Sequence, residues 1–334
     1  MTLAWTLVQF AACAAVIGRA GYVLSISADR IAAATGLTGG WIGLALLATV
    51  TSLPELASGI SAVTWLEAPN LAVGNALGAC VLNLFFLAVI DTVQRRQPMY
   101  PQASAAHLLS AAFGVVMGGF VALSLVMAER MPSMLNLGLY SPALLALYLV
   151  ALRSVYAHEH GSAAEGAQPR LSVLAPALRR EWRRFGVAAL AVIAAGSWLP
   201  GIADSLAQAM GWSRSFVGTL LMALVTTLPE MVVTLSALRI GALDMAIGNL
   251  LGSNLFNLLI LAVDDLFYAP GPLLAKVAPV HAATAVAAVV MTGLVMIGLV
   301  MRPGGRVMRV ASWISIGLVV AYLLSASLVF LHGA

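Results

Sequence analysis

The chain has 334 residues, of which 61% are hydrophobic and 9% are charged, and its mean hydropathy is +0.99. Soluble domains carry about 25% charged residues, so this composition excludes a soluble globular protein. The formal net charge of +4 does not indicate a nucleic-acid partner, because the basic residues are distributed as in a membrane protein.

Ten apolar stretches recur along the chain, and each approaches or exceeds the roughly 20 residues that a helix needs to cross a bilayer. They are predicted at residues 3–26, 39–65, 69–93, 104–128, 134–156, 185–209, 214–238, 242–267, 277–301 and 308–331. This pattern predicts an all-α, polytopic membrane protein with ten transmembrane helices. The opening MTLAWTLVQF lacks the positive region of a cleaved signal peptide, so we expect the first span to be retained.

The positions of arginine and lysine predict the orientation of the chain. With the N-terminus outside, 13 of the 17 basic residues fall in connections that face the cytoplasm. Because cytoplasmic connections are enriched in basic residues, we expect a multi-pass protein of the inner (plasma) membrane with both termini outside. Cys13 and Cys80 lie in predicted spans, which suggests no disulfide framework.

One long segment occurs twice: Thr51–Asn83 is repeated, with changes, at Thr226–Asn257. We therefore divide the chain into a first five-helix repeat (1–156), a basic cytoplasmic linker (157–184) and a second five-helix repeat (185–334). Because each half holds an odd number of spans, the second half enters the membrane inverted. Inverted repeats are typical of alternating-access transporters with a site between the repeats, although channels also use them.

Each copy of the repeated segment carries a glutamate directly after a proline, at Pro54-Glu55 and Pro229-Glu230. Proline removes a backbone donor and breaks a helix, and the residue before it, Leu53 or Leu228, is expected to leave helical geometry. Irregular backbone at membrane depth survives only inside protein or beside a wet cavity. An ionisable side chain there is costly and usually functional, so we predict a functional break in each repeat.

The two glutamates predict a cation site if they face each other across the pseudo-twofold axis. Two negative charges suit one Ca²⁺ or two Na⁺, and Ca²⁺ takes six to eight oxygen ligands. Neutral oxygens are at hand in four hydroxyls, those of Thr51, Ser52, Thr226 and Thr227. Neither motif contains histidine, which disfavours a soft-metal site. The alternative interpretation is a pair of protonated glutamates hydrogen-bonded to neighbouring helices.

The next span of each repeat adds polar side chains to an apolar helix. Ser253 and Asn257 are four residues apart and share a helix face, and Ala79 and Asn83 occupy the matching places in the first repeat. The preceding GxxxG patterns favour close helix packing. The amides are predicted to serve the cation, with helix–helix hydrogen bonding as the alternative.

The paired sequences TSLPEL…GNALGACVLN and TTLPEM…GNLLGSNLFN resemble the alpha-repeats of the Ca²⁺:cation antiporter superfamily, in particular its prokaryotic sodium/calcium exchangers. The resemblance implies long first and sixth helices that slide across a core, and Na⁺ entry exchanged for Ca²⁺ exit. It implies no cofactor and no enzymatic activity. The ligands that it implies are Glu55, Glu230, Asn83, Asn257, Thr51, Ser52, Thr226, Thr227 and Ser253, with the backbone carbonyls of Ala48 and Ala223.

Three residues depart from the pattern of that family. Ala79 stands where relatives usually have serine, Asn257 where they often have aspartate, and Thr227 where serine is usual. The first two remove a hydroxyl and a negative charge, which leaves the coupling ion, Na⁺ or H⁺, and its stoichiometry open. The alternatives are an H⁺-coupled or other-divalent cation antiporter, a cation channel and an intramembrane hydrolase. A hydrolase needs a nucleophile or metal with positioned partners, and neither motif supplies them.

Five further aspartates lie near the ends of predicted spans: Asp29, Asp91, Asp204, Asp264 and Asp265. We expect them to be solvated at the membrane interface or to cap helices. The alternative is that they concentrate cations at the mouths of the protein.

Overall fold

The structure is a computed structural model, and it describes residues 3–35, 47–94, 98–130, 132–134, 136–162, 175–305, 307 and 311–333. The long helices of these ranges are α1 (Leu3–Thr35), α3 (Leu53–Trp65), α4 (Pro69–Val93), α6 (His107–Val126), α7 (Tyr140–Ser162), α8 (Ala175–Met210), α11 (Leu228–Arg239), α12 (Leu243–Phe267), α13 (Val280–Met301) and α14 (Trp313–His332). The short helical pieces are α5 (Met99–Gln102), η1 (Ala128–Arg130), α9 (Arg214–Phe216), the π-helix η2 (Val217–Met222), α10 (Ala223–Thr226) and η3 (Leu273–Lys276).

Among the described residues, eight helices are long and apolar enough to cross a membrane, and a bent pair, 214–226 with 228–239, forms a ninth candidate. The N-terminal part of the predicted span 39–65 lies outside the described residues, so the count of ten remains a prediction. The predicted span 134–156 begins later, at Tyr140, because a two-stranded hairpin of β1 (Ser133–Met134) and β2 (Leu137–Gly138) precedes it. Helices α7 and α8 extend into the predicted linker from both ends.

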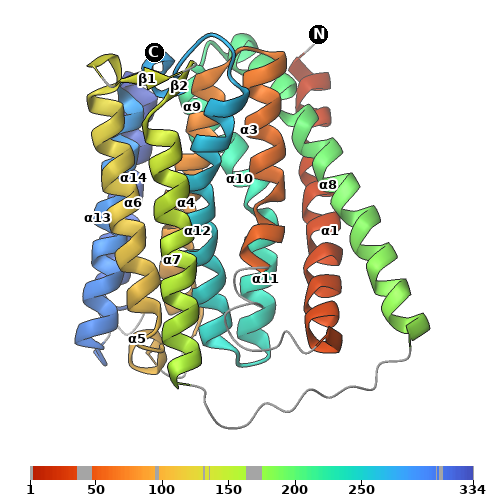
Figure 1. The fold of residues 1–334 in the computed structure, drawn as a ribbon, viewed down its shortest axis with the longest axis vertical. Helices are drawn as coiled ribbons and strands as arrows, with labels where there is room; N and C mark the ends of the chain where they lie inside the picture. The colour runs from red at the N-terminus through yellow and green to blue at the C-terminus, as the bar shows by residue number, and fades with distance from the viewer. Residues whose placement is uncertain are drawn as a thin grey trace.

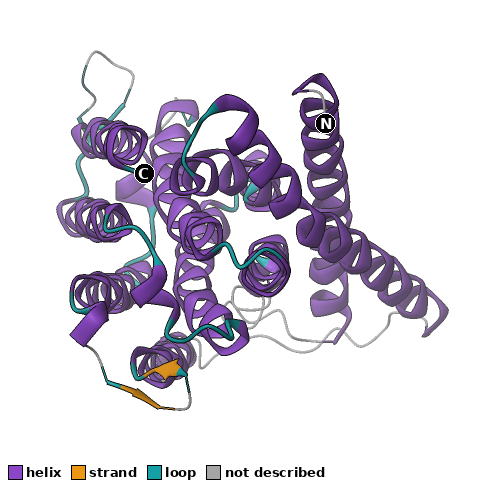
Figure 2. Cartoon of the chain, turned by 90° about the horizontal axis from the view of Figure 1, so that it is seen from above, coloured by secondary structure: helices purple, strands orange, loops and turns teal. Residues whose placement is uncertain are grey.

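The bundle has a central pair of helices and an outer pair. Helices α4 and α12 pack against each other, and 89% and 78% of their most apolar windows are buried. Helix α1 is only 22% buried by the same measure, and it packs against α8 at one side of the molecule (Figures 1 and 2). Four of the other long helices, α6, α7, α13 and α14, lie on the opposite side from α1 and α8 (Figure 1).

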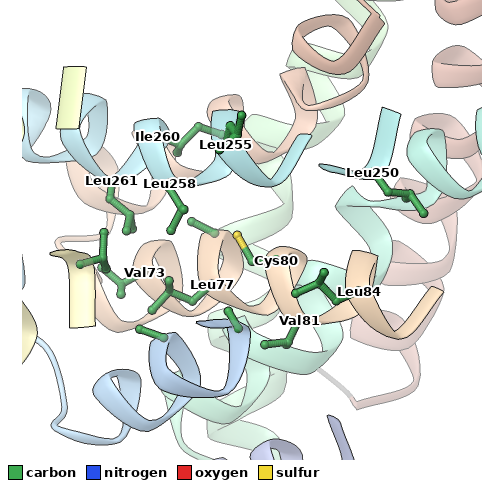
Figure 3. Close-up of a cluster of buried hydrophobic side chains, with 14 of the residues drawn as sticks. Val73, Leu77, Cys80, Val81, Leu84, Leu250, Leu255, Leu258, Ile260 and Leu261 are labelled. Carbon is green, nitrogen blue, oxygen red and sulfur yellow. The ribbon is translucent and has the colours of Figure 1, made fainter. Parts of the chain in front are cut away.

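The centre of the bundle is apolar on both helices of the central pair. Val73, Leu77 and Cys80 of α4 lie beside Leu258 and Leu261 of α12 in one buried cluster (Figure 3). A helix that is hydrophobic on all sides belongs inside a protein or a membrane, which explains why these two sequences show no polar face. The few buried polar residues of these two helices are therefore candidates for a binding site.

Two of the aspartates near span ends hold loops against the bundle. Asp91 on α4 accepts two hydrogen bonds at the start of α14, from the backbone N–H of Ser312 at 2.8 Å and from the Ser315 hydroxyl at 2.7 Å. Asp265 on α12 accepts from the backbone N–H groups of Gly138 and Leu273 and from the Tyr140 hydroxyl. Both are buried, so they anchor structure from inside the protein; the expected solvation at the interface is wrong for this pair.

Candidate functional site

The two breaks in helical geometry come directly before the helices that carry the glutamates. The backbone leaves regular helical geometry at Ser52 (φ −87°, ψ 11°) and at Thr227 (φ −80°, ψ 3°), and α3 and α11 begin at the next residue. The departure predicted at Leu53 and Leu228 is therefore wrong by one residue. Proline is tolerated in the first turn of a helix, where its missing N–H has no partner to lose, so the disruption moves to the residue before that turn.

Glu55 and Glu230 occupy the first turns of α3 and α11. A helix N-terminus carries partial positive charge, which favours a carboxylate there. Both side chains are completely buried, and the hydroxyl of Ser52, three residues before Glu55, lies 2.9 Å from Glu230 Oε1. The structure thus brings the two carboxylates, 175 residues apart in the chain, into one interior region.

The predicted hydroxyls are distributed unequally between the two carboxylates. The Ser52 hydroxyl donates to Glu230 Oε1 at 2.9 Å, so the first repeat serves the glutamate of the second. The residue that matches Ser52 is Thr227, and its hydroxyl donates to the carbonyl of Ala223 at 2.7 Å. Among the described residues, neither oxygen of Glu55 has a hydrogen-bond partner.

The other hydroxyls line the same region from both repeats. Thr51 and Ser253 lie 3.4 Å apart between their oxygens, and both lie beside Glu230. Thr226 lies beside Glu55 and donates to the amide oxygen of Asn75 at 3.0 Å. All these residues are at most 1% exposed.

The predicted carbonyl ligands already accept hydrogen bonds within their own helices. The carbonyl of Ala48 accepts from the Thr51 hydroxyl at 3.1 Å and from the Ser52 backbone N–H at 3.1 Å. The carbonyl of Ala223 accepts from Thr227 in the same two ways, at 2.7 Å and 3.0 Å. A cation at either carbonyl would have to displace a hydroxyl donor.

The two predicted amides differ in what they contact. Asn83 donates to the side-chain oxygen of Asn254 at 3.1 Å, and its own oxygen finds no partner in the described part of the chain. The same part of the chain supplies no partner for either polar side-chain atom of Asn257. Buried polar atoms are hydrogen-bonded in the great majority of cases, so the free oxygens of Asn83, Asn257 and Glu55 indicate a place that is built for a ligand.

Sequence reasoning missed two polar residues of this region, Asn75 and Asn254. Asn75 recurs as Asn249 in the second repeat, and that duplication was a usable signal. Asn254 matches Cys80, and the two form reciprocal contacts, with the Asn254 amide donating to the Cys80 carbonyl at 3.2 Å. Because these matched residues differ in type, comparison of the repeats alone gave no signal for Asn254.

A pair of glycines was also missed. Gly21 of α1 is packed so tightly against Pro229 that an added Cβ would lie 2.4 Å from the proline ring. Gly196 of α8 packs in the same way against Pro54, where an added Cβ would lie 3.0 Å from the carbonyl oxygen. The two glycines share the 175-residue offset of the glutamates, which was their signal. Helix α1 of the first half therefore contacts the helix break at Pro229, and α8 of the second half contacts the helix break at Pro54.

The site offers oxygen chemistry and is closed. The described residues contain no group of three or more histidine, cysteine, aspartate or glutamate side chains placed to hold a metal ion, so two carboxylates with neutral oxygens are its donor set. A cavity of about 700 Å³ lies instead between α1 and α8 and is lined by apolar residues and four arginines, Arg19, Arg180, Arg183 and Arg184. The carboxylates themselves are sealed from solvent.

Comparison with known proteins places these features among exchangers. A family profile described as "Sodium/calcium exchanger protein" matches residues 5–156 and 182–331. CaxA of Alkalimonas amylolytica, named as a candidate antiporter, is 30% identical over 237 residues, which cover 69% of this chain and 70% of the relative. The sodium/calcium exchanger MaX1 of Methanosarcina acetivorans is 48% identical over 63 residues, 19% of this chain and 18% of MaX1.

A solved structure extends the similarity over nearly the whole fold. It is the sodium-calcium exchanger NCX_Mj soaked with 2.5 mM Na⁺ and 10 mM Sr²⁺, which matches with a TM-score of 0.66 and covers 98% of this chain and 99% of that chain. The sequence identity is 19%, so this likeness establishes the fold and not the choice of ion.

Proposed function

Because this chain belongs to the sodium/calcium exchanger family, we propose that it is a secondary antiporter that exchanges Ca²⁺ for Na⁺ across the membrane. The resemblance of its repeated motifs to that family is confirmed by the match over both halves. Family membership favours transport over intramembrane hydrolysis. The observation that carries the proposal is the burial of Glu55 and Glu230 in one interior region, which the contact of Ser52 with Glu230 at 2.9 Å joins. Neither glutamate is in an ion pair with a described residue.

Charge balance makes the exchange competitive. An unpaired buried carboxylate is costly, and a bound cation relieves that cost. One Ca²⁺ or two Na⁺ neutralise Glu55 and Glu230, so one site cannot hold the full complement of both ions. Loading by either cation then permits a change of access, whereas the empty and doubly charged site resists closure.

The contacts of the outer helices support a sliding mechanism. In this proposal the chain forms ten helices as two inverted repeats, 1–156 and 185–334, and α1 with α8 moves across the core to change access from one face to the other. Gly21 and Gly196 place these helices directly on the breaks that precede the glutamates. Because glycine lacks a Cβ, it lets helices approach closely, so a change in the breaks reaches the moving helices without an intermediate layer.

Coupling to H⁺ is the second candidate, and Asn257 and Ala79 favour it. An aspartate and a serine at these places would strengthen Na⁺ binding, and this chain has neither. We propose an inner-membrane location with both termini outside, so that Ca²⁺ leaves the cytoplasm as Na⁺ or H⁺ enters.

Isotope flux in reconstituted vesicles tests the function. Purified protein should take up ⁴⁵Ca²⁺ when a Na⁺ gradient is imposed, and this uptake should persist after an ionophore collapses the pH gradient. Glu55→Gln and Glu230→Gln should each abolish uptake, whereas Asp244→Asn, a change at an exposed carboxylate, should not. Full uptake by both glutamine variants would refute the proposed site, and single-channel currents would identify a channel instead.

A further inference from the structure

Asp264 is a buried carboxylate that the proposed exchange site does not use. It lies on α12, is completely buried, and has no hydrogen-bond partner for either oxygen among the described residues. Its neighbour Asp265 accepts from several donors. The expectation that Asp264 is solvated or caps a helix is therefore wrong.

The carboxylate of Asp264 rests on the backbone of α3. A Cβ added to Gly59 would lie 2.4 Å from Asp264 Oδ2 and 2.5 Å from Oδ1. Gly59 follows Glu55 by four residues, one turn along the same face of α3, a rise of about 6 Å. The position of Asp264 is thus one helical turn away from the central glutamate.

The same relation holds on the other helix. Asp264 follows Asn257 by seven residues, which is two turns along one face of α12, and α3 and α12 pack against each other. Among the described residues, Glu55, Asn257 and Asp264 have no partner for either side-chain polar atom. From Glu55 to Gly59 along α3, and from Asn257 to Asp264 along α12, the chain runs toward the end of the bundle where both termini lie (Figure 1).

A purely structural role does not account for this carboxylate. A cap, an ion pair or a polar contact between helices each requires a partner, and the described residues supply none. The adjacent residue, Asp265, is also an acid and supplies no counter-charge, and on the facing helix α3 the nearest acid in sequence is Glu55. The matching position of the first repeat is Ile90, so this acid belongs to one side of the protein only.

We propose that Asp264 binds the monovalent coupling cation, Na⁺ or H⁺, as a second station between the central site and the face on which the termini lie. The inference rests on the proposed antiport function and adds the residue that receives the coupling ion. Asp264 also supplies a negative charge two turns along α12 from Asn257, which has none.

Three flux measurements on the reconstituted protein test the station. The first is Ca²⁺/Ca²⁺ exchange without a coupling ion, and the others are Ca²⁺ uptake driven by a Na⁺ gradient or by a pH gradient alone. Asp264→Asn should retain Ca²⁺/Ca²⁺ exchange within about twofold, and it should need at least tenfold more of the coupling cation for half-maximal uptake. The gradient whose dependence shifts identifies the ion.

Gly59→Ala provides a second variant, since it keeps the carboxyl group and displaces it; the same shift of about tenfold is expected. Asp244→Asn is the matched control and should leave all three measurements unchanged. If Asp264→Asn and Gly59→Ala both match the parent protein under both gradients, the station is refuted and the antiporter stands. If the parent protein shows no Ca²⁺ exchange of any kind, the proposed function and the station both fail.

Discussion

The two halves of the site carry matched residues, yet they hold their glutamates differently. Glu230 accepts a hydrogen bond from Ser52, whereas Glu55 has no partner among the residues that the structure describes. The difference follows from one substitution, since Thr227 stands at the place that matches Ser52. A threonine in a helix is restricted at χ1 and readily donates back to a carbonyl of the preceding turn, as Thr227 does toward Ala223.

The lesson is that one methyl group can break the symmetry of a duplicated site. The first repeat offers its hydroxyl across the interface, and the second keeps its hydroxyl within its own helix. A cation that enters therefore meets one carboxylate that is already stabilised and one that is not.

The largest expected effect is on the rate of Ca²⁺ uptake, and it should differ between the glycine of α1 and the glycine of α8. Gly21→Ala puts a methyl group 2.4 Å from the Pro229 ring, and Gly196→Ala makes a milder contact of 3.0 Å with Pro54. Overpacking costs about 1–3 kcal/mol, so we expect Gly21→Ala to slow Ca²⁺ uptake about tenfold or more and Gly196→Ala less. Initial rates of ⁴⁵Ca²⁺ uptake measure this. Gly201→Ala is the control, because a Cβ added at Gly201 would meet no packed atom within 4 Å. Equal slowing by all three variants would contradict the role of the two proline contacts.

Removal of the hydroxyl that donates to Glu230 should weaken cation binding. Ser52→Ala deletes the hydroxyl that donates to Glu230 at 2.9 Å. Hydrogen bonds to charged groups contribute about 1.5–3 kcal/mol, so half-saturation by Ca²⁺ should rise about tenfold or more. Ser236→Ala removes a hydroxyl bonded within its own helix, to Val232, and should leave the Ca²⁺ dependence unchanged. A Ser52→Ala protein with the parent affinity would remove this hydroxyl from the site.

Restoring the symmetry should strengthen binding by a smaller factor. In Thr227→Ser the hydroxyl loses its branched methyl and is free to turn toward Glu55, which has no donor. A hydrogen bond gained there is worth about 0.5–1.5 kcal/mol, which corresponds to about two- to tenfold tighter Ca²⁺ binding in an isothermal titration. Thr92→Ser, where the threonine is bonded to its own helix, is the control. Weaker binding by Thr227→Ser would show that its bond to Ala223 is needed.

The smallest effect concerns the hydroxyl that the first repeat lacks. Ala79→Ser supplies the match of Ser253, whose oxygen lies 3.4 Å from that of Thr51. One additional neutral oxygen should lower the Na⁺ concentration for half-maximal uptake about twofold, since a single neutral contact is worth about 0.5–1.5 kcal/mol before the cost of fitting the side chain. An unchanged Na⁺ dependence would place this position outside the ion path.

The prediction of the site from sequence drew on the positions where the two repeats agree. The glutamates and the hydroxyls beside them recur at an offset of 175 residues and the amides at 174, whereas Ser253 has Ala79 as its counterpart. The prediction failed for Asn254, which has no counterpart of the same type, and for Asp264, whose environment depends on Gly59 of another helix. The contacts of Gly21 and Gly196 with the prolines also needed the packing of helices from opposite halves of the chain.

The sequence by itself determined that this is a helical membrane protein with acidic breaks in two related segments, because hydropathy, proline and charge act locally and leave their pattern in the order of residues. Only the tertiary structure decided which carboxylate has a donor, which asparagine is free and where Asp264 lies. Those outcomes depend on distances of about 3 Å between different helices, and such distances are set by how the side chains pack together in three dimensions.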